Sequence, residues 1–97
     1  MPTFGGERMA TLQIQSAEIA APTSTAAAVD VSRATQVRVV NSGSTARLVT
    51  IVSAPSGDVL GSTTVPGYET LVIRKGSTEC MFAANAEIKL SRVGVVG

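Results

Sequence analysis

The chain has 97 residues, of which 44% are hydrophobic and 3% aromatic, and its eight basic and seven acidic side chains leave a formal net charge of +1. This length fits one domain with a thin core, and the small charge excludes a dedicated nucleic-acid-binding protein, which needs a strongly basic surface. One cysteine and no histidine exclude disulfides and the usual metal staples, so we expect self-association or docking on a partner to supply stability.

Residues 1–9 predict an arm that precedes the folded domain. The segment places one large apolar side chain, Phe4, before the pair Gly5 and Gly6, which is poor material for a strand or a helix. Phe4 is therefore a candidate assembly contact. Met9 can alternatively be the first residue of the protein, in which case the residues before it are not part of the chain.

The first residues also bear on localisation. Glu7 and Arg8 occupy the place where a signal peptide needs its apolar region, and no run approaches the ~18 apolar residues of a membrane span. We therefore expect synthesis in the cytoplasm, no export by that route and no membrane partner.

Residues 10–97 predict a single all-β domain, an antiparallel sandwich or barrel of about seven strands. Short runs that alternate apolar and polar residues are separated by clusters of Gly, Pro, Asn and Ser. The Ala-rich segment 17–31 is less patterned and fits a loop, a strand or a helical turn. The expected strands lie at 10–16, 36–41, 46–53, 59–65, 70–75, 79–83 and 86–93.

Turn residues predict how two of these strands pair. The run PSGD separates 47–53 from 59–65, with proline at the first corner and Gly57 available for a left-handed conformation, so the two segments should form a hairpin. Gly43 can take positive φ in the preceding turn, and Gly67 follows a proline in the arrangement of a type II turn.

The core must be built from Val, Ile, Leu and Ala around Phe82, because aromatic residues are scarce. In the last strand the alternation places Ile88 and Leu90 inside. Cys80 lies in an apolar run and is interpreted as a reduced core residue. Tyr68 is interpreted as capping the end of the core with its hydroxyl in water, the alternative being a platform for stacking on a sugar.

Some strands are apolar on both faces. Either β-bulges turn the second set inward, or the outer face is covered by another subunit. Val49 and Ile51 are therefore candidate assembly contacts, and so are Val95 and Val96 in the apolar tail 94–97. The two sets of opposite parity are Val40, Val49, Ile51 and Val72 against Val39, Leu48, Val52 and Ile73.

No pattern in the chain predicts catalysis, a cofactor or a metal site. Without histidine, a Ser or Cys nucleophile would need Lys75, Lys89 or a carboxylate as its base, and no spacing supports such a pair. The run RKGST at 74–78 differs from a phosphate loop because its glycine follows the lysine and its flanks are strands. The acidic residues are too scattered for a calcium loop.

The segment 37–97 resembles the small virion structural proteins of tailed bacteriophages, especially marine and cyanobacterial phages. The likeness is carried by a hairpin with the turn NSGS, the strand GSTTV, the turns PGYE and KGST, and the terminal run KLSRVG. It implies a non-enzymatic particle component located in the virion after synthesis in the host cytoplasm.

The resemblance implies a capsid decoration, or cement, protein that docks on the shell through its β domain and termini. A component of the head-to-tail neck or of the tail is the alternative. The implied partners are copies of the chain itself and the major capsid or neck protein. From another class, a carbohydrate- or host-binding β module also fits the predicted sandwich.

Overall fold

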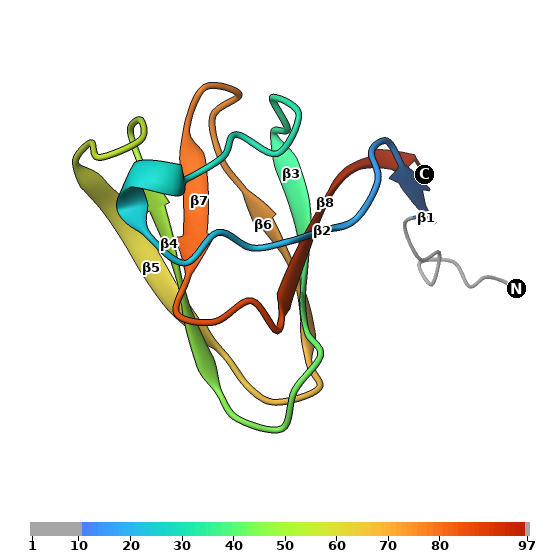
Figure 1. Ribbon diagram of the computed structural model, residues 1–97. Coiled ribbons are helices and arrows are strands. Elements are labelled where there is room, and N and C mark those ends of the chain that lie inside the picture. Colours follow the sequence, from blue (N-terminus) through green and yellow to red (C-terminus); the bar gives the residue numbers. More distant parts are fainter. Residues whose placement is uncertain (1–10, 97) are drawn as a thin grey trace, which may run out of the picture.

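The computed structural model describes residues 11–96, with side chains as far as residue 94. Figure 1 shows two antiparallel β-sheets packed face to face, so the predicted all-β sandwich is confirmed. The arm 1–9, with Phe4, lies outside the described residues.

One sheet has five strands in the order β1-β8-β3-β6, with β2 also paired to β8, and the other has three in the order β5-β4-β7. The Ala-rich segment contributes a two-residue strand and one turn of 3₁₀ helix. The elements are β1 (Thr11–Ile14), β2 (Ile19–Ala20), η2 (Thr25–Ala27), β3 (Gln36–Asn41), β4 (Arg47–Val52), β5 (Val59–Val65), β6 (Thr70–Arg74), β7 (Cys80–Ala83) and β8 (Ile88–Val96).

The main core lies between the sheets and is almost entirely aliphatic. Val37 and Val39 of β3 point inward beside Leu90 of β8, and all three are fully buried. Ile88 is also fully buried, as predicted from the alternation in β8. Met81 fills the core from β7.

Phe82 is not at the centre of this core, contrary to the prediction. Successive side chains of a strand point to opposite faces, so with Met81 inside, Phe82 faces outward from the three-stranded sheet. There it packs half-buried against a separate small cluster of Ala28, Val52 and Cys80. Tyr68 does not cap the core either, because it lies in a turn with 73% of its surface exposed.

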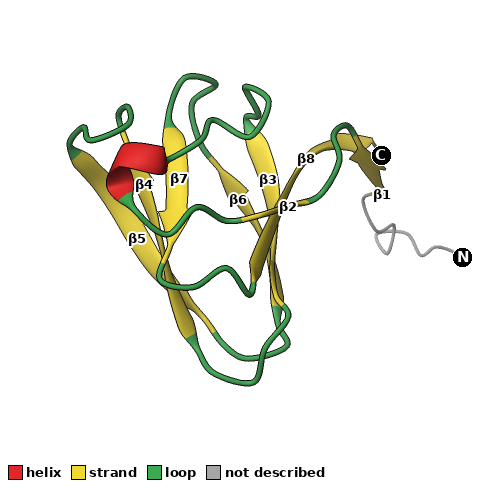
Figure 2. Cartoon of the chain, viewed as in Figure 1, coloured by secondary structure: helices red, strands yellow, loops and turns green. Residues whose placement is uncertain are grey.

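The apolar residues on both faces of β4 are explained by an arrangement that the sequence did not suggest. The pairing of β4 with β5 does shift register between Ile51 and Val52, but the extra residue lies on β5, and β4 keeps a regular register with β7, so no bulge turns its second set of apolar residues inward. The outer face beside Val52 is covered by the chain itself, through Ala28 at the end of η2. Figure 2 shows this helix lying over β4 and β7.

The segment that carries β2 and η2 also closes one side of the sandwich. Ala21 donates a backbone hydrogen bond to the Ile88 carbonyl of β8 at 2.8 Å, and Pro22 accepts one from Ala83 of β7 at 2.9 Å. Val29 and Met81 then exchange two backbone bonds. The segment therefore joins the edges of both sheets, and the opposite side, between β5 and β6, receives no such cover from residues 11–96.

The predicted hairpin of β4 and β5 is confirmed, but its turn chemistry is different. No glycine between residues 11 and 96 has positive φ, and in the turns at 55–58 and 66–69 the left-handed positions are taken by Ser56 and Tyr68, each with φ 59°. Gly57 is needed instead for close approach, since a Cβ there would lie 2.5 Å from the Ser53 hydroxyl oxygen. Gly67 similarly approaches the backbone of Ser44.

One buried polar side chain joins the two sheets. Asn41, at the end of β3, is fully buried, and its amide nitrogen donates to the carbonyl oxygens of Thr45 at 2.7 Å and Val65 at 3.0 Å. Its side-chain oxygen accepts a bond from the Gly43 amide at 3.0 Å. Because Val65 belongs to β5, the side chain holds the β3–β4 turn against the opposite sheet.

Residues 94–96 are not a free tail. They continue β8, and their backbone pairs with β1 in the register Val96↔Thr11 and Val95↔Leu12. The side chains of Val95 and Val96 lie outside the described set, so their role as assembly contacts stays a prediction.

Candidate docking surfaces

A small apolar pocket opens on the uncovered side of the sandwich. We call it the β5–β6 opening, and its volume is about 180 Å³. The space exists because an inward position of β5 holds Gly61, where an added Cβ would meet nothing within 4 Å. The pocket is lined by Val49, Ile51, Gly61, Ser62, Thr63 and Ile73.

The two strands that border this opening have free edges. Within residues 11–96, β5 pairs only with β4, and β6 pairs only with β3. Every residue of β5 except Val65 is exposed, and the strand contains no charged residue and no proline. Charges and prolines usually help to protect an edge strand from pairing with another chain, and β5 has neither; its one protective feature is the register shift opposite Ile51 and Val52, at its start.

A second surface is formed by a two-stranded ribbon, which we define as β1 paired with residues 93–96 of β8. Figure 1 shows this ribbon projecting from the rest of the sandwich. Leu12 is 39% exposed and Ile14 is 79% exposed. Two-stranded ribbons are marginally stable in water by themselves, and the exposed apolar residues make this one a candidate docking surface.

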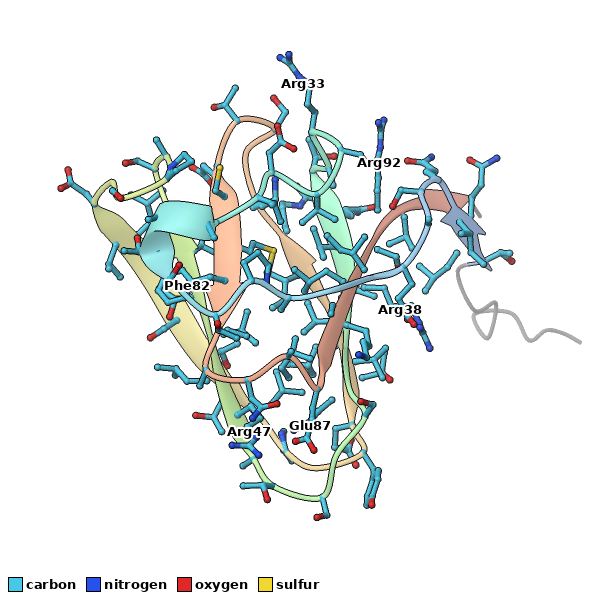
Figure 3. The ribbon with its side chains drawn as sticks, viewed as in Figure 1. Arg33, Arg38, Arg47, Phe82, Glu87 and Arg92 are labelled. Atoms are coloured by element: carbon cyan, nitrogen blue, oxygen red, sulfur yellow. The ribbon has the colours of Figure 1, made fainter. Side chains whose placement is uncertain are left out.

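The base of the ribbon is held to the sandwich by Arg92. Its guanidinium donates to the side-chain oxygen of Gln15 at 3.0 Å and to the Ser32 carbonyl at 3.1 Å. Its backbone amide donates to the Ser16 hydroxyl at 2.8 Å. The labelled Arg92 in Figure 3 lies where the ribbon leaves the sheet.

Beneath the ribbon runs a groove of about 480 Å³ on the outer face of the five-stranded sheet. Its floor includes the buried residues Ser91 and Val93. An ion pair between Arg38 and Glu18, at 3.6 Å, borders it. The full lining is Leu12, Ile14, Ser16, Glu18, Arg38, Ser91 and Val93.

Lys75, which no spacing in the sequence supported as a catalytic base, has a structural role. Its ammonium group is buried and donates to the carbonyl oxygens of Ala34 at 2.8 Å and Gly76 at 3.1 Å. Burial lowers the pKa of Lys75, and the negative charge of Asp30 opposes that shift. The contact to Ala34 secures a turn in which residues 31–33 all have left-handed φ, between 56° and 59°.

Cys80 is a buried free thiol, as predicted, although it lies in the small outer cluster and not between the sheets. Burial raises the pKa of this thiol, and the nearby Asp30 carboxylate adds to the rise. Its sulfur lies 3.7 Å from the Thr78 carbonyl oxygen. A thiol that is both buried and hard to ionise is a poor nucleophile.

The predicted contact residues are distributed unevenly. Val49 is only 1% exposed and belongs to the core, so it meets a partner only from inside the β5–β6 opening, and Ile51 lines that opening half-buried. Sequence reasoning missed Ile14 as a surface residue. It also missed Gly61, although an isolated glycine in a strand pattern is a signal of a close backbone approach or a missing side chain.

Among residues 11–96, no group of three or more Cys, Asp and Glu side chains could hold a metal ion, and no helix is long and apolar enough to cross a membrane. Comparison with known proteins finds no matching family, no matching curated protein and no matching solved structure.

Proposed function

We propose that the chain is a non-enzymatic structural subunit of a phage particle, a capsid decoration protein that docks on the shell. The observation that carries this proposal is the projecting ribbon with its exposed Leu12 and Ile14. An element that stands away from the core and carries apolar side chains gains from burial on another protein, at roughly 1.5–3 kcal/mol for each fully buried side chain. On a symmetric shell that gain repeats at every site.

The surroundings of the ribbon suit a specific interface. An apolar centre with a polar rim is the usual anatomy of protein contacts, and the groove combines Leu12 and Ile14 with the bordering Arg38–Glu18 ion pair. Charges at a rim set orientation and partner choice more than affinity. Among residues 11–96, the ribbon is thus the part best suited to meet the shell.

The first experiment is to purify virions of the source phage and measure the copy number of this chain by quantitative mass spectrometry. A decoration protein is present in a fixed, high ratio to the major capsid protein. A few copies per particle would replace the decoration role with a neck or tail role, and absence from the virion would overturn the proposal.

The second experiment locates the contact. Ile14→Ser should lower occupancy on undecorated shells by roughly five- to thirty-fold at limiting protein, which corresponds to a loss of about 1–2 kcal/mol per site. Its melting should match the parent, because Ile14 is mostly exposed. Leu48→Ser, another exposed apolar residue but on β4 of the other sheet, is the matched control and should bind normally. Equal binding by both variants would exclude the ribbon as the contact.

A further inference from the structure

We propose that the β5–β6 opening of one copy receives Phe4 from the arm of a second copy, with the arm lying along the free edge of β5. The proposal shares the assembly role argued above but names a different contact, between copies of this chain. The pocket has a volume of about 180 Å³, and Val49, Ile51 and Ile73 contribute to a chiefly apolar lining surface. A buried apolar cavity of about 150 Å³ accommodates benzene, so the opening has the size of one phenyl ring.

The chain itself supplies few rings that could fill this space. Its aromatic residues are Phe4, Tyr68 and Phe82. Phe82 is already packed in the outer cluster, and Tyr68 lies in a turn. Phe4 is the remaining aromatic residue, and the six residues from Met1 to Gly6 carry no charged side chain. An uncharged segment suits the uncharged edge of β5.

The fold already uses an extended segment in the equivalent way on its other side. There the segment from β2 to Val29 bonds to the edges of β8 and β7 and closes the sandwich. The side between β5 and β6 has two free edges and no such segment among residues 11–96. Addition of an extended peptide to a free edge is a common mode of recognition, in which backbone bonds give affinity and side-chain pockets give specificity.

Geometry favours a second copy as the donor. Phe4 precedes Thr11, the first residue of β1, by seven positions, so it reaches at most about 25 Å from there at 3.3–3.6 Å per residue. Figure 1 shows β1 and β5 at opposite ends of the view, in a molecule whose longest dimension is 50 Å. Reciprocal exchange of arms between two copies gives a closed dimer, and one-way insertion repeated from copy to copy gives a ring or a filament.

Sedimentation velocity of the full chain over a range of concentrations tests this proposal. The parent should self-associate. Phe4→Ala removes the inserted ring, and Gly61→Val places a side chain in the pocket, where its Cβ meets nothing within 4 Å. Each should weaken association at least about ten-fold, the effect of losing a central interface contact. Thr64→Val, on the exposed outer face of the same strand, is the matched control and should associate like the parent.

Mixing the two defective variants gives the decisive result. Phe4→Ala retains an open pocket and Gly61→Val retains a complete arm, so together they should form a heterodimer that grows no further. Failure to form it, or a parent that stays monomeric at every concentration, would overturn the proposal. The assay needs no phage shell. If the copies associate but the virion lacks the chain, the proposed function alone is wrong.

Discussion

Replacing Asn41 with alanine should strongly destabilise this domain, because a single side chain there satisfies three backbone groups. Asn41 is fully buried and makes three hydrogen bonds, to Thr45, Val65 and Gly43. A buried backbone group left without its partner costs about 1–3 kcal/mol. With three groups affected, we expect a loss of at least about 3 kcal/mol in the free energy of unfolding, out of a total of roughly 5–15 kcal/mol for a domain.

Urea unfolding followed by far-ultraviolet circular dichroism measures this loss. Thermal unfolding gives a second measurement. At roughly 4–8 °C per kcal/mol for a domain of this size, the melting temperature should fall by about 12 °C or more. Asn41→Asp separates hydrogen bonding from packing, since it preserves size and the acceptor oxygen but removes the donor to Thr45 and Val65. It should be about as damaging as alanine at neutral pH.

Asn85→Ala is the matched control. Asn85 is half-buried, and its side-chain oxygen accepts one bond, from the Glu87 amide at 2.8 Å, so its loss should cost only about 1 kcal/mol. If Asn41→Ala loses less than about 1 kcal/mol, or no more than Asn85→Ala, the bonds across the sheets do not stabilise the fold as argued.

Three further outcomes are expected. Gly57→Val should lower the free energy of unfolding in urea by about 1 kcal/mol or more, because its Cβ would collide with Ser53. The penalty comes from overpacking and not from positive φ. Unfolding like the parent would show that the turn rearranges freely. Burial lowers the folded pKa of Lys75 below its ordinary 10.5, so its charged form is penalised in the fold, and stability should rise with pH through the window just below 10.5. Lys75→Met should lack that rise when the two proteins are compared at the same pH values. Arg47 forms a part-exposed ion pair with Glu87 at 3.1 Å, and both side chains are labelled in Figure 3. Arg47→Ala should therefore lower the free energy of unfolding by less than about 1 kcal/mol, and this loss should shrink in high salt.

The strand pattern was readable from residue 36 onward because its signals are local. Alternation of apolar residues and the intervening turns located β3 to β8, and the pairing of β4 with β5 followed from the short loop between them. The segment 17–31 was not readable, because small residues such as alanine adopt whichever conformation their neighbours impose. Its hydrogen bonds to Ile88, Ala83 and Met81 come from strands far along the chain.

By itself the sequence determined the fold class, the strand positions and the inward alternation of Ile88 and Leu90, since each depends on residues a few positions apart. Only the tertiary structure decided that Val49 is inside while Phe82 faces the outer cluster, because both faces of those strands are apolar and the covering segment selects between them. The tertiary structure also decided that Gly61 leaves a pocket, since a missing side chain becomes a cavity only where a second sheet lies opposite and no other residue fills the space.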